Sequence, residues 1–203
     1  MVYALLPGLQ ATAIAELPTT AKLVILIIVD DFLAYWSHRL RHTVRPLWFF
    51  HMIHHSQEHL NPFTTKRFHP FENLFHKVVV LTIPMAIIGA NMEMWALYFL
   101  IDAAWDYLIH SNLRLNVRPL RYLIVTPQYH RIHHSRLPEH LNTNFSDRLP
   151  VWDHIFGTVS SDTRSYPPTG VPDFPSHSDE RPLRFPIQHV RDLLFPLTQI
   201  YRE

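Results

Sequence analysis

Histidines in three short groups most restrict what this chain can fold into. Two groups have an HxxHH pattern and one has an HxxxH pattern: His38 and His42; His51, His54 and His55; His130, His133 and His134. Residues three and four positions apart share one face of an α-helix, so each group directs its imidazoles the same way. Neutral imidazole is a common ligand of iron, zinc, copper and nickel. Eight such ligands exceed the four of one tetrahedral site, so the pattern predicts two metal ions held close together.

Composition indicates a mostly helical chain and excludes several classes of function. A length of 203 residues suits one domain, and alternating runs of β-branched residues are few. The absence of cysteine excludes disulfides, thiolate zinc sites and cysteine-ligated iron–sulfur clusters. No GxGxxG or GxxxxGK[ST] motif suggests a nucleotide fold. A formal net charge of +1 without a basic run gives no reason to expect a nucleic-acid partner.

Apolar residues concentrate in three blocks, at residues 21–36, 77–90 and 92–109. The first block, extended through His38, approaches the roughly 20 residues that a membrane helix needs. The other two blocks are joined by a Gly-Ala-Asn turn and predict a helical hairpin. Its first arm has about 14 apolar residues, or about 21 Å of helix, which is short for a span of ~30 Å. This arm either extends back through Phe75 and His76 or enters the membrane without crossing it.

These blocks predict an all-α fold, with membrane-embedded helices carrying a cytosolic helical cap that holds a His-rich dimetal site. We expect a single domain over residues 1–203, with membrane helices at about 21–40 and 77–110 and the cap at about 41–76 and 111–203. In the cap, residues 160–186 are rich in proline and should be irregular. Residues 187–201 have an amphipathic helical pattern that Pro196 interrupts.

The distribution of charge supports this topology. If the first block crosses once and the hairpin enters and returns, every histidine group emerges on the same side. That side also carries most of the basic residues, among them Arg39, Arg45, Lys66, Arg121 and Arg131. The opposite side carries little more than Lys22. By the positive-inside rule, we expect an integral membrane protein whose cap faces the cytoplasm.

Two acids and one further histidine extend the candidate site. Asp31 shares a helical face with His38 and His42, and an acid in a membrane helix is costly and usually marks function. We expect Asp31 to orient a ligand imidazole, unless it is simply hydrated at the membrane interface. Asp106 stands four residues before His110, so the same reasoning makes Asp106 a second orienting acid and His110 a ninth candidate ligand.

The remaining histidines are less clearly placed. His69 is either a further ligand or, with Glu72, a support for its own loop. His59 and His140 flank the groups and have no assigned role. The other isolated histidines are interpreted as surface or structural residues: His154, His177 and His189.

Over about residues 31–158 the chain resembles the fatty acid hydroxylase/sterol desaturase superfamily of membrane-bound, non-haem di-iron oxygenases. The resemblance lies in the ordered motifs DFLAYWSHRLRH, FHMIHHS, FHPFE, IHSNLRL, TPQYHRIHHS and WDHIFGT. It implies a four-helix membrane anchor and a cytosolic helical cap that holds two irons. It implies ligand roles for His38, His42, His51, His54, His55, His130, His133 and His134, with His110 as a further ligand.

The chain departs from the family pattern at three points. Some hydroxylases have a second histidine four residues after the position of His110, where this chain has Arg114. A tenth imidazole is then missing or comes from elsewhere, such as His69. The expected NFG after the last group reads Asn144-Phe145-Ser146, and only three apolar blocks are visible.

Two hypotheses of function follow. The first is an O2-dependent di-iron enzyme that hydroxylates or desaturates a C–H bond of a lipid from the bilayer: a sterol, a fatty acyl chain, an alkyl glycerol or a carotenoid. Because no flavin or nicotinamide motif is visible, its electrons would come from a partner such as a cytochrome b5-like or ferredoxin-like protein. The second is a non-redox protein: a membrane zinc site, a metal transporter or a haem-binding anchor. A transporter would hold ligands near the membrane midplane, whereas these histidines lie mostly beyond the apolar blocks.

Overall fold

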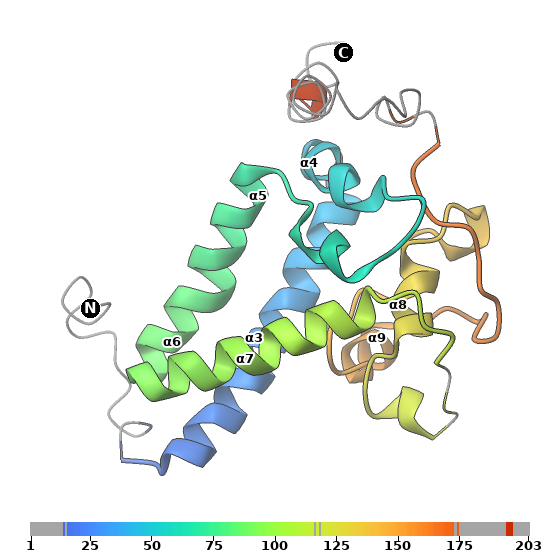
Figure 1. Ribbon diagram of the computed structural model, residues 1–203. Coiled ribbons are helices and arrows are strands. Elements are labelled where there is room, and N and C mark those ends of the chain that lie inside the picture. The colour runs from blue at the N-terminus through green and yellow to red at the C-terminus, as the bar shows by residue number, and fades with distance from the viewer. Residues whose placement is uncertain are drawn as a thin grey trace.

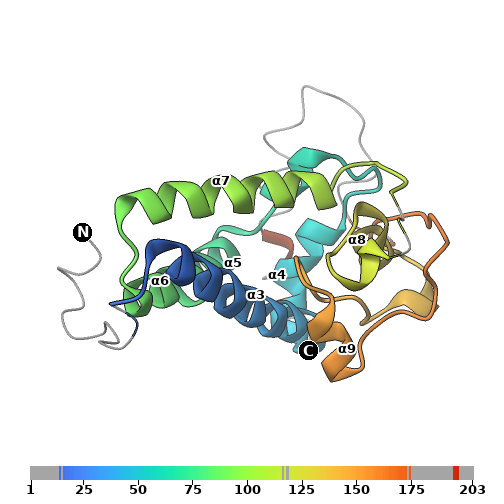
Figure 2. The same ribbon diagram turned by 90° about the horizontal axis from the view of Figure 1, so that it is seen from below.

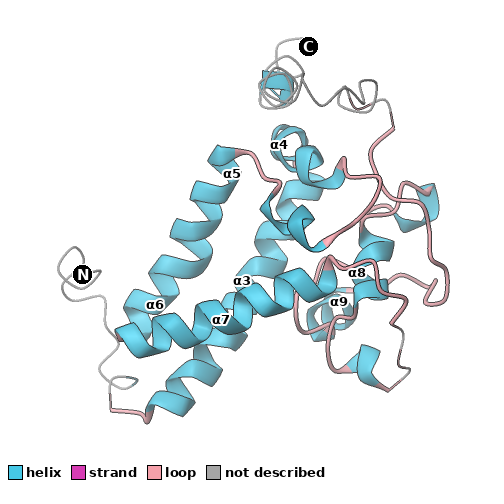
Figure 3. Ribbon diagram, in the orientation of Figure 1, coloured by secondary structure: helices cyan, strands magenta, loops and turns pink. Residues whose placement is uncertain are grey.

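The computed structural model describes residues 14, 16–115, 117, 119–172, 174 and 194–196, and the regular elements in these residues are helices (Figure 3). The one β-type contact among them is an isolated bridge between Ser135 and Thr169. The all-α prediction is therefore confirmed. Residues 160–172 are irregular, as expected. The amphipathic helix predicted at 187–201 lies outside the described residues, apart from 194–196.

The helices follow one another along the chain in the order shown by the colours of Figure 1. They are α3 (Thr19–Thr43), α4 (Arg45–His55), η1 (Pro62–Lys66), α5 (Pro70–Phe75), η2 (His76–Thr82), α6 (Ile83–Ile88), α7 (Met92–Ile109), η3 (Leu120–Tyr122), α8 (Pro127–His133), η4 (Pro138–His140) and α9 (Val151–Phe156).

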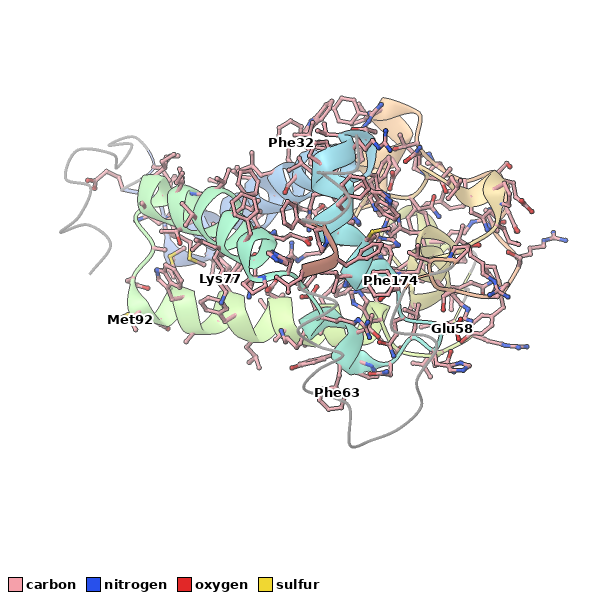
Figure 4. The ribbon with its side chains drawn as sticks, turned by 90° about the horizontal axis from the view of Figure 1, so that it is seen from above. Phe32, Glu58, Phe63, Lys77, Met92 and Phe174 are labelled. Atoms are coloured by element: carbon pink, nitrogen blue, oxygen red, sulfur yellow. The ribbon has the colours of Figure 1, made fainter. Side chains whose placement is uncertain are left out.

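Three long helical segments form the body of the fold: α3, the continuous run of α5, η2 and α6, and α7. They pack together through a buried apolar cluster: Leu26, Leu81, Met85, Ile88, Ala90, Met94 and Tyr98. Figures 1 and 2 show α4, α8 and α9 gathered at one end of these segments, and we call this part the cap. Figure 4 shows Met92 at the end of α7 that is remote from Glu58 in the cap.

The first arm of the hairpin is longer than the apolar pattern alone indicates. It begins at Pro70 and runs to Ile88, 19 residues or about 28 Å. Its middle section, η2, is a π-helix, in which Ile83 N–H donates to the carbonyl of Val78, five residues earlier. Pro84 follows directly, and its ring would clash with the carbonyl four residues earlier in a regular α-helix. The wider π-turn relieves that clash, so the helix continues through the proline.

The turn between the two arms is placed as the sequence predicts. Gly89 ends α6 with a φ of 79°, a left-handed conformation that glycine adopts without steric cost. Asn91 then begins α7, because its side chain accepts a hydrogen bond from Met94 N–H.

Among the described helices, Pro70–Ile88 is the one that is long and apolar enough to cross a membrane, by length and composition. The helices α3 and α7, expected to span as well, do not meet this criterion, because each carries several charges. In α3 these include Lys22, Asp30 and Asp31, and in α7 they are Glu93, Asp102 and Asp106.

Candidate metal centre

The structure gathers all nine candidate histidines into two adjacent clusters. The five-histidine cluster consists of His38, His42, His51, His55 and His133, and the four-histidine cluster consists of His54, His110, His130 and His134. Within each cluster, one nitrogen of every ring lies within 4.8 Å of the others. The clusters meet where the rings of His55 and His134 stack with their centroids 4.2 Å apart.

Local sequence features aim these rings at one another. Helix α3 ends at Thr43, and the extended backbone of Val44 turns the chain before α4. Pro46 lies in the first turn of α4, where no N–H is needed. This bend brings the rings of His38 and His51 to 5.0 Å. Helix α8 begins at Pro127 after a cap by Thr126, whose side chain accepts from Tyr129 N–H. His110 and His134 are the C-cap residues that directly follow α7 and α8.

The Nε2 atoms of the rings converge. In the five-histidine cluster, His55 Nε2 lies 3.1 Å from Nε2 of both His42 and His133. In the four-histidine cluster, His110 Nε2 lies 3.2 Å from His54 Nε2 and 3.0 Å from His130 Nε2. An imidazole nitrogen has one proton or one lone pair, so a single hydrogen bond cannot satisfy two such neighbours. Two nitrogens bound to the same cation at about 2.1 Å are about 3.0–3.4 Å apart, which fits these distances.

Four rings have their other nitrogen held by the protein. His38 Nδ1–H donates to Phe145 O (2.8 Å) and His133 Nδ1–H to Thr143 O (2.9 Å). His110 Nδ1–H donates to Asp106 O (2.8 Å), and His51 Nδ1–H donates to the carboxylate of Glu72 (2.7 Å). A proton on Nδ1 leaves a lone pair on Nε2, which is the form that binds metal.

Two clustered rings have a buried Nε2 atom that lacks a hydrogen-bond partner among the described residues. The Nε2 atoms of His38 and His51 are buried and make no hydrogen bond to any described residue. A buried acceptor without a hydrogen-bond partner raises the free energy of the folded state, and a bound cation would satisfy both nitrogens. The donor set therefore fits two metal ions, one in each cluster.

Burial also keeps the imidazoles neutral. The side chains of His51, His130 and His134 are each 1% exposed. Burial, and after it the neighbouring imidazoles and charges, lower the pKa of six cluster histidines well below the usual 6.5: His42, His54, His55, His130, His133 and His134. At neutral pH these rings are unprotonated and able to bind metal.

The two acids predicted to orient imidazoles have other partners. Asp31 accepts from the main-chain N–H groups of Arg148 and Leu149 and from the indole N–H of Trp152. These bonds hold the cap to α3, and none of them goes to an imidazole. Seven residues of helix, about 10 Å, separate Asp31 from His38. The Asp106 carboxylate accepts from Thr65 Oγ1, and only the main-chain oxygen of Asp106 reaches His110.

His69 and His140, whose roles the sequence did not decide, lie outside both clusters. His69 caps α5 by accepting from Phe71 N–H, and its ring packs against Phe50, so it supports its loop. His140 is buried between Ser135 Oγ (2.9 Å) and Asp162 (3.2 Å), where it braces the loop after α8.

Sequence reasoning missed the groups that hold Nδ1. Glu72 stood in a recognisable motif, FHPFE, but its spacing from His51 gave no sign of contact. The carbonyls of Thr143 and Phe145 are main-chain groups and have no signal in the sequence.

A cavity of about 250 Å³ lies between the clusters and the long helices. Its lining includes five cluster histidines: His38, His51, His54, His110 and His130. The rest of the lining includes Ala34 of α3, Leu81 of η2 and Phe99 of α7, so the cavity reaches between the long segments. Lys77, labelled in Figure 4, also contributes to the lining.

Arg148 of the cap lines this cavity and binds acidic residues of two long helices. The guanidinium of Arg148 donates to Asp30 (2.7 Å), to Tyr98 Oη (3.2 Å) and to Asp102. Arg148 is 9% exposed and Asp30 is 1% exposed, so these acids of the helices are compensated inside the protein.

Comparison with known proteins agrees with this geometry. Ornithine lipid hydroxylase OlsE of Rhizobium tropici is 33% identical over 147 residues, 72% of this chain and 44% of that protein. Human alkylglycerol monooxygenase is 32% identical over 136 residues, 65% of this chain and 29% of that protein. Very-long-chain aldehyde decarbonylase GL1-6 of Oryza sativa subsp. japonica is 31% identical over 145 residues, 64% of this chain and 21% of that protein. The chain thus spans less than half the length of each of these relatives.

No solved structure matches the chain significantly. The family model described as fatty acid hydroxylase matches residues 23–158, which is more than half of the chain and includes all nine clustered histidines. The chain therefore belongs to the fatty acid hydroxylase family.

Proposed function

We propose that this chain is a membrane-bound di-iron oxidoreductase that uses O2 and two electrons to hydroxylate or desaturate a lipid C–H bond. One observation carries the proposal: nine imidazoles converge in two adjacent clusters beside a cavity. Membership of the fatty acid hydroxylase family supports a lipid as the substrate.

Each cluster would hold one iron ion through its Nε2 atoms. Imidazole donors suit iron, zinc, copper and nickel alike, so the choice of iron rests on the family. Bound iron would supply the activation of O2 that oxidation of an unactivated C–H bond requires.

The protein's own residues would orient the metal ligands and the lipid. The carbonyls of Thr143 and Phe145 fix two imidazoles as Nδ1–H tautomers, so the rings do not need to reorganise. The cavity lining would place a lipid carbon beside His51 and His54. Since both rings are buried, bulk water has little access to the reacting carbon.

The long helices would provide access from the bilayer. Pro70–Ile88 is the first candidate to cross, and all three segments expose large apolar side chains: Val24 and Ile28; Leu74 and Val78; Leu97 and Leu100. Such side chains are stable in contact with lipid tails. The positive-inside rule favours a cytoplasmic cap.

The electrons would come from a separate protein of the cytochrome b5-like or ferredoxin-like kind. Exposed basic residues of the cap, such as Arg45, Arg114 and Arg136, could attract an acidic carrier. The relatives suggest the class of lipid: one is named for ornithine lipids and another for alkylglycerols.

The experiment compares the lipids of cells that do and do not express the chain, with isotopically labelled O2. We expect a lipid that gains one labelled oxygen atom or loses two hydrogens, and we expect neither change in His133→Ala. The matched control is His59→Ala, because His59 is exposed and outside both clusters. Identical lipids with and without the chain, under conditions where iron and a reductant are supplied, would contradict the proposal.

A further inference from the structure

Glu72 differs from every other group that holds a cluster imidazole. The Nδ1 atoms of His38, His110 and His133 bond to main-chain carbonyls, whereas His51 bonds to the Glu72 carboxylate at 2.7 Å. Asp147 Oδ1 lies 3.5 Å from His38 Nδ1, which is further than the carbonyl that already accepts from that ring. Within the described part of the chain, His51 is thus the one clustered histidine whose Nδ1 hydrogen-bonds to a carboxylate.

Three helices converge on this carboxylate. Glu72 lies in the first turn of α5 and is 5% exposed, and its Oε1 accepts from His51 of α4 and from the Arg41 guanidinium of α3. Arg41 is itself fixed, because its Nε donates to Ser37 O at 3.1 Å. An oxygen that accepts from a guanidinium and from Nδ1–H leaves His51 with its lone pair on Nε2.

The two clusters are therefore supported unequally. In the five-histidine cluster, three rings have an acceptor for Nδ1, and one of these acceptors is charged. In the four-histidine cluster, only His110 has one, and the Nδ1 atoms of His54, His130 and His134 have no hydrogen-bond partner among the described residues. A carboxylate behind an imidazole orients the ring and makes it a stronger donor to metal.

We propose that Glu72 is a positioning residue that acts through His51 to make the five-histidine cluster bind its metal ion more tightly than the four-histidine cluster does. This inference rests on the proposed function only in requiring two cation sites. Glu72 is not itself a ligand, since its oxygens are not part of either group of converging donor atoms.

The test measures metal affinity and does not depend on turnover. The full chain is purified in detergent, stripped of metal and titrated with Co(II), whose visible absorption reports each binding event. In the unaltered chain we expect two distinct dissociation constants. In Glu72→Gln we expect the tighter constant to rise about 10–100-fold while the weaker one changes less than about threefold.

The matched control is Asp162→Asn. It breaks a carboxylate–imidazole contact of the same kind, between Asp162 and the buried His140, outside both clusters. We expect both constants to stay as they are in the unaltered chain.

A double-mutant cycle separates positioning from a general structural effect. If Glu72 acts through His51, adding Glu72→Gln to His51→Ala leaves both constants unchanged, because the coupled partner is already gone. Additive losses in the double variant, or equal weakening of both sites in Glu72→Gln, would overturn the proposal. If Glu72→Gln does not fold, Glu72→Asp keeps the charge but withdraws the carboxylate, and the same selective loss is expected.

Failure of this inference differs from failure of the proposed function. A chain that binds two Co(II) ions and oxidises lipid, but whose Glu72→Gln variant titrates like the unaltered chain, contradicts only the role of Glu72. A chain that binds fewer than two ions contradicts both.

Discussion

At the scale of single residues, the clusters depend on imidazoles that fold in the neutral form. Burial and the neighbouring rings lower the pKa of His54, His130 and His134 well below 6.5 in the folded chain. In the unfolded chain these rings titrate near 6.5. The unfolded state therefore takes up more protons than the folded state when the pH falls below that value, and stability must fall with it.

We predict that the free energy of unfolding of the metal-free chain decreases as the pH is lowered from about 7.5 to about 5.5. Urea denaturation in detergent at several pH values measures it. A variant with His54, His130 and His134 all changed to Gln should lose less stability over this interval. Stability that is constant or rises on acidification would show that the rings are not buried in the neutral form.

A second prediction at this scale concerns Asp31. Because Asp31 accepts from Arg148 N–H, Leu149 N–H and the Trp152 indole, Asp31→Asn should lower the free energy of unfolding by about 2–3 kcal/mol. The number of metal ions bound per chain should not change. Thermal unfolding and metal analysis measure the two effects. Loss of metal from a variant that remains folded would restore the role that the sequence suggested.

At the scale of elements, the cap is joined to two long helices by the Arg148 guanidinium. Its partners Asp30 and Asp102 belong to α3 and α7, and the first of these contacts is buried. Removing one member of a buried ion pair leaves the other charges uncompensated, which costs more than the pair contributes.

We predict that Arg148→Ala lowers the free energy of unfolding by about 3–5 kcal/mol, because Asp30 is left buried and unpaired. Thermal unfolding of the purified chain measures it. The control is Arg136→Ala, since Arg136 is exposed and donates to the Pro168 carbonyl through its main-chain N–H, which alanine keeps. Equal stability of the two variants would mean that Arg148 does not hold the cap in place.

Some of the helices and turns could be predicted from the sequence, and others could not. Periodicity predicted the long helices and the turn at Gly89. The HxxHH spacing predicted that all rings of one group point the same way, and this holds only for rings four positions apart. His51 and His55 lie in one cluster and His130 and His134 in the other, whereas His54 and His133 each lie in the opposite cluster from the rest of their group.

The start of α5 at Pro70 was not predicted, because Pro70 lies before the apolar block, in a stretch with polar residues such as Glu72. The π-turn that lets the helix pass Pro84 was not predicted either, because it has no periodic signature. The partner of Asp30 was not predicted either, since Arg148 follows it by 118 residues and only the tertiary fold joins them.

At the scale of the whole molecule, the proposed function requires the cap and the Gly89 turn to lie on opposite sides of a membrane. Only Pro70–Ile88 meets the criterion for a span by length and composition among the described helices. The pairing of buried Asp30 and partly buried Asp102 with Arg148 would reduce the cost of inserting α3 and α7 beside it.

This topology predicts which side of the membrane each residue faces. The chain has no cysteine, so single cysteines can be introduced at Met92, which is 80% exposed at the start of α7, and at Glu58 in the cap. In intact cells a membrane-impermeant maleimide should label Met92→Cys, and it should label Glu58→Cys only after permeabilisation. Equal labelling of both in intact cells would contradict the predicted crossing.

The most direct measurement of the central claim is anaerobic reconstitution of the metal-free chain with ferrous iron, followed by metal counting and Mössbauer spectroscopy. We predict about two iron ions per chain, one for each histidine cluster, with magnetic coupling after exposure to O2. One zinc ion per chain, no retained iron and no O2 uptake with any reductant would contradict the account.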